Sequence, residues 1–483
     1  MTTLRVYWDQ LRSSFWFIPA MGLLLGLVLA EGMVRIDRAF FADRASDWWL
    51  ATTPDASRSL LSTLSGALVS VTALVFSITM LTLSQTASSY GGRLLRTFLD
   101  RLLSQVTLGS FLGTAIYCIW VLRTVRELEA VAFTPHLATA TAIGLSLGCM
   151  GLLVAFINYT AQMLQPSEIL ASVSKDITKA IERIYPAGLA EPPVTPPADP
   201  SFPGADRREI RLGRAGYLQA VTEEALLEQA NAAAGLVRLR VRPGLFVSSQ
   251  TVVAEVLPAA AADDEVAASI ADAFVIGTDR TPRQDIEAAL LELVEVAVRA
   301  LSPGINDPRT AITATHYLSD AFVRLAGRPF PSQYRAVDGE LRLIMPRERF
   351  GPMLAAAFTA ILHYSGDFGP NIEAIIEAAG RINNAIVLAA DPGGPAAASG
   401  SGDAPAEHDR PHDLDEKRAA LTDLLQLVEA HVAEHITGPA RDRLRDQSRQ
   451  VREQIAAHAD STDGDRAADS LATAMQAVRD DGS

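Results

Sequence analysis

Hydroxyl side chains recur along an apolar run near the N-terminus, where they could either pack helices or line a hydrated path. Two rows repeat every seven residues: Thr63, Ser70, Ser77 and Ser84, and Ser65, Thr72, Thr79 and Thr86. At about 100° per residue, the two rows lie on nearly opposite faces of a helix. Such a helix is expected to be central in its bundle, with the hydroxyls bonded to backbone and neighbours. A hydroxyl-lined conduction path is the alternative, and the sequence leaves it open.

A second group of polar residues lies in a loop at residues 302–311, between two predicted helices. Pro and Gly residues end the first helix, and Asp307 can cap the second. Turn chemistry therefore accounts for the composition of the loop. The alternative is that Asn306, Asp307 and Arg309 present a polar site to a ligand or partner.

Carboxylates gather on one side of the predicted helix at residues 282–301. Apolar residues repeat on one face of this helix, and Asp285, Glu292, Glu295 and Arg299 fall on the other. Clustered carboxylates can hold a metal or transfer protons. Because charged faces usually contact water, we expect a solvated or oligomer-facing stripe here instead.

Four apolar runs are long enough to cross a bilayer, at residues 15–34, 60–83, 106–122 and 137–163. A span needs roughly 20 apolar residues, so these runs predict four N-terminal transmembrane helices. The first run could instead be a cleaved signal peptide, since Arg5 and Arg12 precede it. Pairs of glycines, Gly109 with Gly113 and Gly144 with Gly148, predict close helix contacts, as does Gly66 with Ser70.

Charge is distributed unevenly along the chain. The first 165 residues carry 11 Arg and 9 acidic residues, whereas the remainder carries 31 basic and 47 acidic residues. The acidic remainder argues against nucleic-acid binding, because it offers no basic field to the phosphates. Lys and Arg near the ends of the spans number eight on the side of the termini and six on the other. This bias predicts that both termini are cytoplasmic.

The soluble part is expected to be mainly helical α+β, with a small β module and a helical tail. An Asp-Gly pair at Asp338 and Gly339 predicts a β-hairpin. The predicted division is a four-helix transmembrane domain at 1–165, an exit helix and Pro-rich linker at 166–206, a β-containing module at 207–258, a mainly helical domain at 259–390, a disordered linker at 391–412 and a helical tail at 413–483.

Four segments resemble a family of bacterial membrane proteins called domain of unknown function 2254. They are residues 76–84, 93–96, 216–219 and 299–308, and the last of these is the most specific. The resemblance covers roughly residues 1–390 and implies an integral membrane protein with four N-terminal helices and a soluble domain. For a bacterial protein of this kind we expect a multi-pass location in the inner membrane. It implies no reaction, substrate or catalytic residue.

Two functions fit these observations. The first is an oligomeric, channel-like or transport-associated protein with a cytoplasmic regulatory domain, since four spans cannot easily enclose a pore alone. The second is a membrane-anchored scaffold or sensor that binds a cytoplasmic protein through the 302–311 loop and the tail. Nucleotide-binding and nucleophile motifs and complete metal-binding motifs are absent from the sequence, so we expect neither an enzyme nor a cofactor.

Overall fold

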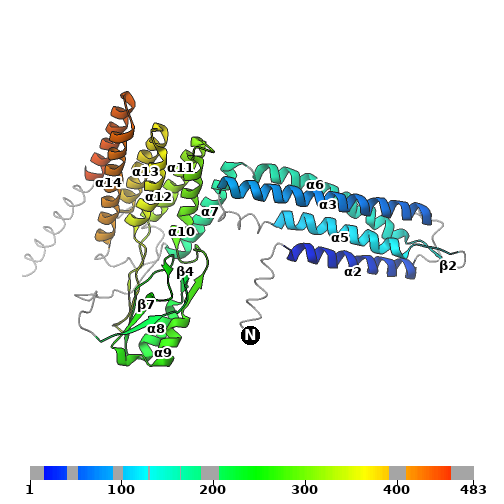
Figure 1. Ribbon diagram of the computed structural model, residues 1–483, viewed down its shortest axis with the longest axis horizontal. Coiled ribbons are helices and arrows are strands. Elements are labelled where there is room, and N and C mark those ends of the chain that lie inside the picture. Colours follow the sequence, from blue (N-terminus) through cyan, green and yellow to red (C-terminus); the bar gives the residue numbers. More distant parts are fainter. Residues whose placement is uncertain are drawn as a thin grey trace, which may run out of the picture. The chain divides into compact units, whose positions relative to one another are not determined.

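The computed structural model describes residues 16–40, 53–90, 102–128, 131–163, 165–186, 206–390 and 410–457. The chain forms two compact units, Met1–Ile169 and Leu170–Ser483 (Figure 1). The expected Pro-rich linker, residues 391–409 of the expected disordered linker and the tail after residue 457 lie outside the described residues.

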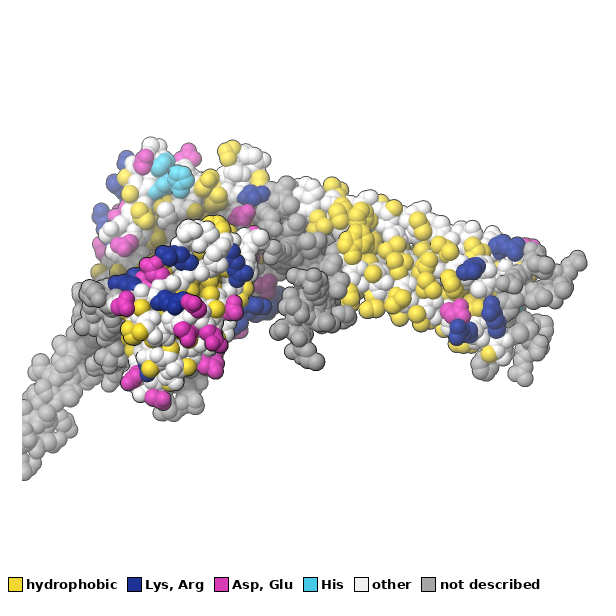
Figure 2. All heavy atoms as spheres, turned by 60° about the horizontal axis from the view of Figure 1, so that its bottom comes forward, with side chains coloured by type: hydrophobic (Ala, Val, Ile, Leu, Met, Phe, Trp, Pro, Cys, Tyr) yellow, Lys and Arg dark blue, Asp and Glu magenta, His cyan; other side chains and the backbone are white. Residues whose placement is uncertain are grey.

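The first unit consists of long apolar helices. Within the described residues, four helices are long and apolar enough to cross a membrane, which confirms the four predicted spans. They are α2 (Phe17–Phe40), α3 (Pro54–Tyr90), α5 (Leu102–Thr124) and α6 (His136–Met163), and a short hairpin of β1 (Arg126–Leu128) and β2 (Val131–Phe133) connects the last two. The surface of this unit is largely hydrophobic, with charged side chains gathered towards the end that carries the hairpin (Figure 2).

The central helix of this unit is α5. In its most apolar window 61% of the residues are buried, against 17% in α3. The helices α2, α3 and α6 all pack against α5, so each of them keeps an outer face. The expectation that α3 would be the central helix is therefore wrong for a single chain, because alternating hydroxyl rows do not reveal which helix has neighbours on all sides.

Glycines allow α2 and α5 to approach closely. A Cβ atom on Gly22 would lie 2.4 Å from the carbonyl oxygen of Gly109, and one on Gly26 would lie 2.1 Å from that of Gly113. The predicted contact through Gly109 and Gly113 is therefore confirmed, and its partners are two glycines at the same spacing. In contrast, no atom of the described residues lies within 4 Å of a Cβ built on Gly66, Gly144 or Gly148, so the described part of the chain does not make the contacts expected there.

A buried carboxylate joins α2 to the start of α6. The Asp37 side chain accepts hydrogen bonds from the backbone N–H groups of Leu137, at 3.0 Å, and Ala138, at 2.8 Å. These N–H groups belong to the first turn of α6 and have no partner within the helix. Asp37 thus caps a helix 100 residues away, a role that its sequence context does not indicate.

The second unit begins within the exit helix α7 (Pro166–Ile184), which is followed by two small sheets and two short helices. The first sheet has the order β3-β7-β5-β10-β9, and the second has the order β6-β4-β8. The predicted hairpin is present as β9 and β10, and β10 also pairs in parallel with β5. The bounds are β3 (Arg208–Arg211), β4 (Gly216–Val221), α8 (Glu223–Ala232), β5 (Leu236–Leu239), β6 (Phe246–Val247), β7 (Val252–Leu257), α9 (Asp264–Asp272), β8 (Phe274–Gly277), β9 (Tyr334–Val337) and β10 (Glu340–Ile344).

Helices form the rest of this unit and stand side by side (Figure 1). They are α10 (Ile286–Ala300), α11 (Pro308–Ala326), α12 (Phe350–Ser365), α13 (Gly369–Ala390) and α14 (Arg410–His435), and residues 439–457 are also helical. The helix α11 packs on α10 and α13, while α14 packs on α12 and α13. The predicted β-containing module (207–258) and the predicted helical domain (259–390) are thus parts of one compact unit. They are joined because β10 of the hairpin pairs with β5 in one sheet.

Candidate functional site

The two hydroxyl rows of α3 have different surroundings. Thr63, Ser70, Ser77 and Ser84 are exposed in the chain, whereas Thr72 is buried and Ser65 and Thr79 are half-buried. Several hydroxyls donate to a carbonyl of their own helix, among them Thr63 to Ser59, at 2.8 Å, and Thr72 to Leu68, at 2.7 Å. The row that contains Thr72 thus faces into the bundle, whereas the row that contains Ser70 lies on the outer face of α3.

The 302–311 loop has both the predicted turn chemistry and an exposed tip. The Asp307 carboxylate accepts from the Thr310 backbone N–H at 3.2 Å and from its hydroxyl, so Asp307 caps α11 as expected. Asn306 has a φ of 49°, which Asn tolerates better than most residues. Asn306 and Arg309 are exposed, as is Ile305.

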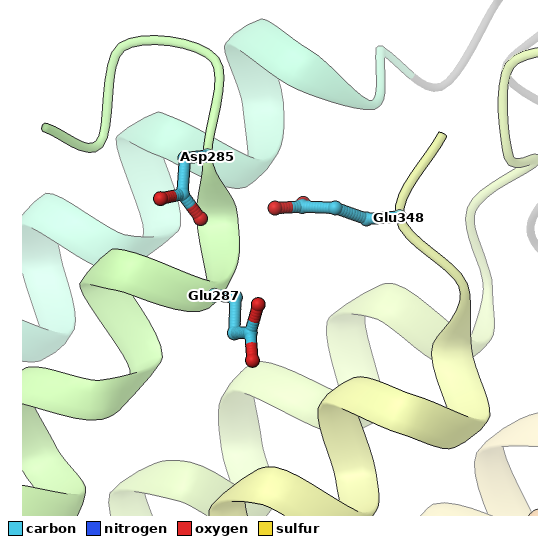
Figure 3. A group of neighbouring side chains, drawn as sticks. All are labelled: Asp285, Glu287 and Glu348. Carbon is cyan, nitrogen blue, oxygen red and sulfur yellow. The ribbon is translucent and has the colours of Figure 1, made fainter. Parts of the chain in front are cut away.

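A cluster of three carboxylates lies inside the second unit. One carboxylate oxygen each from Asp285, Glu287 and Glu348 lies within 4.8 Å of the other two. Asp285 is the N-cap of α10, Glu287 lies in its first turn, and Glu348 precedes α12 (Figure 3). The exposed fraction of Asp285 is 0% and that of Glu348 is 8%.

Two arginines between them contact all three carboxylates, and each arginine contacts two of them. Arg280 forms two hydrogen bonds to Asp285, at 2.7 and 2.8 Å, and one to Glu287, at 3.1 Å. Arg242 reaches Glu287 at 3.1 Å and Glu348 at 3.3 Å. The prediction that Asp285 lies on a solvated stripe is wrong, because Asp285 caps α10 from within the unit and is paired with Arg280 there.

Neighbouring backbone fixes the geometry of the cluster. Gly244 has a φ of +93°, and a Cβ atom at this position would lie 2.4 Å from Oδ2 of Asp285. The backbone N–H of Ile286 donates to Oε2 of Glu348 at 3.3 Å, and the Tyr185 hydroxyl donates to the same oxygen at 3.3 Å. The chain therefore needs glycine at position 244 in order to pass this close to a buried carboxylate.

Glu348 favours the protonated form. Burial raises its pKa to about 8, and a hydrogen bond to Asp285 and the negative charge of that residue act in the same direction. Burial and the proximity of Glu348 also raise the pKa of Tyr185. At Arg280 burial opposes the charge, but the hydrogen bonds and charges of Asp285 and Glu287 raise the pKa overall. The surroundings therefore favour the charged form of Arg280 and the protonated form of Glu348.

The chemistry open to this cluster is the binding of one positive charge. Three carboxylates face two guanidinium groups, so one negative charge is left unbalanced when all three acids ionise. A metal ion could balance it, but it would have to compete with arginines that already contact every carboxylate. A proton shared by Asp285 and Glu348 balances it without displacing either arginine.

A cavity of about 420 Å³ lies beside the cluster, with Glu348 in its wall. Aromatic rings and charged groups contribute to the rest of its lining, which comprises Phe330, Pro331, Gln333, Arg347, Arg349, Phe350 and Glu416. Arg349 is paired with Glu416 at 2.9 Å and Arg347 with Glu223 at 2.8 Å. Lys417 is buried behind the cavity, with its Nζ 5.1 Å from the centre of the Phe330 ring.

Comparison with known proteins identifies the relatives of the chain. Residues 12–377 match the family described as a predicted membrane protein, DUF2254. The chain belongs to this family. Uncharacterized proteins of Mycobacterium bovis and of two strains of Mycobacterium tuberculosis are each 30% identical to it over 367 residues, which is 74% of this chain and 69% of each relative. No solved structure matches the chain.

The DUF2254 match confirms the resemblance seen in the sequence and includes every member of the carboxylate–arginine cluster. It ends within α13, so α14 lies beyond it. Among the residues of the cluster, the sequence analysis considered Asp285 alone as a candidate, and it wrongly expected this residue on a solvated or oligomer-facing stripe. The sequence does contain one indication of the observed role: Asp285 lies directly before the apolar periodicity of α10, which is the position of a capping residue.

Proposed function

We propose that the chain is one subunit of an oligomeric, channel-like membrane protein with a cytoplasmic regulatory domain. The observation that carries this proposal is the exposed hydroxyl row of α3, namely Thr63, Ser70, Ser77 and Ser84. In a single chain this row would face lipid. In an oligomer it would face either a second copy or water, and polar side chains are used in both settings.

Glycines on exposed helix faces support contact between two copies of the chain. Gly22 and Gly26 already pack against α5, while a Cβ on Gly66, Gly144 or Gly148 would meet open space. Gly66 and Ser70 lie one turn apart on the exposed side of α3. Small residues on exposed helix faces allow a neighbouring helix to approach closely, so a second subunit is the partner that we infer.

The length of α3 supports a link between the membrane and the aqueous phase. Its 37 residues span about 55 Å, whereas the hydrocarbon core is about 30 Å thick. Part of α3 therefore extends beyond the apolar core and could transmit a movement outside the membrane into it.

Cross-linking and flux test the proposal in two steps. In lipid nanodiscs, Ser70→Cys is expected to form a disulfide-linked dimer, while Leu25→Cys, at an exposed position of α2, serves as the matched control. In liposomes, Ser70→Leu or Ser77→Leu is expected to change ion flux more than Thr79→Leu does, because Thr79 is half-buried whereas Ser70 and Ser77 are exposed. Silent liposomes containing correctly folded oligomer would overturn the channel function.

A membrane-anchored scaffold or sensor is the second candidate, and the exposed 302–311 loop favours it. Ile305 is 42% exposed between polar neighbours, a composition that suits a protein contact. The expected result is that Ile305→Ser and Arg309→Ala reduce the recovery of a cytoplasmic protein in pulldowns of the whole protein. Recovery of no reproducible partner by the unmodified protein would remove this candidate.

A further inference from the structure

The cavity beside Glu348 has the size and lining of a ligand pocket. Its volume of about 420 Å³ lies within the range of small-molecule pockets, roughly 300–1,000 Å³. Phe330 and Pro331 contribute apolar surface to the lining, and both are half-buried. Arg347 and Arg349, two residues apart between β10 and α12, contribute positive charge. This lining suits a small molecule with an apolar body and a charged head group.

Arg347 can accept a second anionic partner. Its Nη2 donates to Oε2 of Glu223 at 2.8 Å, which is the one hydrogen bond of this guanidinium to another described residue. Glu223 is also paired with Arg335, so two cations share one acid there. A guanidinium has five N–H donors in a planar fork. Arg347 can therefore bind another anion without releasing Glu223.

Arg349 is paired with a carboxylate from α14. Its Nε and Nη2 contact the two oxygens of Glu416 at 3.0 and 2.9 Å, the two-point geometry in which arginine binds a carboxylate or a phosphate. Because the Arg349 side chain is 69% exposed, the pair contributes little and another anion can replace it. Arg349 is also the N-cap of α12 and makes no side-chain capping bond, so the positive end of α12 acts in the same direction.

The acids in the wall do not favour a cation in the cavity. Each oxygen of Glu348 and of Glu416 already accepts a hydrogen bond from a described residue. In contrast, Arg347 has more donors than partners among the described residues. The missing partner in the cavity is therefore negatively charged.

The helix that carries Glu416 is held independently of the Arg349 contact. It stands beside α12 and α13 (Figure 1) and lies beyond the DUF2254 match. The adjacent Lys417 is buried and donates to the carbonyls of Ala326, at 3.2 Å, and Arg328, at 3.1 Å. Release of Glu416 from Arg349 would therefore leave α14 attached.

We propose that the cavity binds a small organic anion, a carboxylate or phosphate on an apolar body, and that this anion displaces Glu416 from Arg349. The head group contacts Arg347 and Arg349, and the body lies against Phe330 and Pro331. The anion supplies a signal for the regulatory domain of the proposed function and rests on that function only for its purpose. Binding is measured without any flux, so silent liposomes would not count against it.

Calorimetric titration of the full chain in lipid nanodiscs tests the proposal, with empty nanodiscs as the blank. The probes are phenyl phosphate and phenylacetate, which carry the two head groups on an aromatic ring. Benzyl alcohol keeps the ring without the charge, and inorganic phosphate keeps the charge without the ring. At least one aromatic anion is expected to bind about tenfold more tightly than either control compound, because charged hydrogen bonds and apolar burial act together.

Two substitutions with opposite expected effects locate the site. Arg347→Gln removes a head-group contact and should weaken binding about tenfold. Glu416→Gln removes the competing carboxylate and should tighten binding about two- to fivefold. Arg324→Gln, which removes an exposed arginine of α11 that is paired with Asp320, is the matched control and should leave the affinity unchanged.

Binding of neither aromatic anion above the blank would overturn the proposal, and so would equal affinity for benzyl alcohol or for inorganic phosphate. Equal affinities of folded Arg347→Gln and Arg324→Gln would also overturn it. Tighter binding by Glu416→Gln supports the proposal even if Arg347→Gln does not fold, whereas unchanged or weaker binding contradicts the displacement of Glu416.

Discussion

Two buried glutamates in the second unit have opposite charge surroundings. Glu255, on β7, contacts Arg207, Arg238 and Arg240, so one acid is surrounded by three cations. Glu348 belongs to a group of three acids that share two arginines. Burial works to raise the pKa of Glu255, but the hydrogen bonds and charges of Arg238 and Arg240 outweigh burial and lower it. At Glu348 burial is deeper and acts together with Asp285, and the pKa rises.

Low solvent exposure alone does not determine whether a carboxyl group is charged. Glu255 and Glu348 are 4% and 8% exposed, yet the local balance of acids and arginines drives their pKa values in opposite directions. An ionised Glu255 is required to neutralise buried Arg238. An ionised Glu348 would have to share Arg242 with Glu287 and would lie beside the negative charge of Asp285. Glu255 is therefore a structural ion-pair partner, and Glu348 is a group that can exchange a proton.

The largest effect is expected from Glu255→Gln. The substitution leaves the Arg238 guanidinium buried without its counter-ion, so the free energy of unfolding should fall by about 3–5 kcal/mol. The measurement is the exchange of the slowest amides of β5 and β7 in the full chain. If Glu255→Gln lowered the free energy of unfolding at pH 7 no more than Glu348→Gln does, the two glutamates would not differ in their structural role.

Gly244→Ala is expected to have the next largest effect, because its methyl group would collide with the Asp285 carboxylate. The free energy of unfolding should fall by about 3 kcal/mol, which combines positive-φ strain with overpacking. Gly339→Ala is the control, since Gly339 also has positive φ but meets no atom within 4 Å. It should cost about 1–2 kcal/mol, and equal costs for the two variants would argue against the close approach at Asp285.

The pH dependence of stability should differ by one proton between the unmodified protein and Glu348→Gln. The raised pKa of Glu348 means that the folded state retains a proton which the unfolded state releases, between the ordinary pKa of 4.5 and about 8. The contribution of this group is fully present below pH 4.5 and is lost as the pH rises to 8, at about 1.4 kcal/mol per pH unit. Glu348→Gln should lack this decline, and an unchanged slope in denaturation curves at several pH values would contradict the assignment.

Glu295→Gln should have the smallest effect. Glu295 and Arg299 form an i,i+4 pair on α10 that is one-third exposed, with a distance of 3.3 Å. Such pairs contribute about 0.3–0.5 kcal/mol, so the free energy of unfolding should change by less than about 0.5 kcal/mol. A loss above 2 kcal/mol would mean that position along α10, and not burial, determines the cost of removing an acid.

Local patterns predicted much of the fold. The four spans, the exit helix, the hairpin at Asp338 and Gly339, and the cap at Asp307 all follow from hydropathy, periodicity or turn chemistry, and they are present. The contact of Gly109 and Gly113 was also predictable, because small residues at this spacing favour close helix packing. Its partners were not, because the pattern does not indicate which helix approaches.

The carboxylate cluster could not be predicted, since its members come from distant parts of the chain. Helical periodicity placed Asp285 opposite the apolar face of α10, but Arg242 and Glu348 reach the cluster from either side along the chain. The same limit applied to α3, where periodicity separated the two hydroxyl rows without indicating which row would face outwards. Which surface is buried depends on tertiary contacts that no local window contains.

Infrared titration of the full chain in lipid nanodiscs reports the protonation of Glu348 itself, because the C=O stretch of a protonated carboxyl group is distinct from that of a carboxylate. The account predicts that one protonated carboxyl band persists at pH 7 and disappears as the pH rises through about 8, and that Glu348→Gln removes this band. Glu255→Gln, if folded, should leave it in place. A protein whose carboxyl groups have all ionised by pH 6, or a band that survives in Glu348→Gln, would contradict the account.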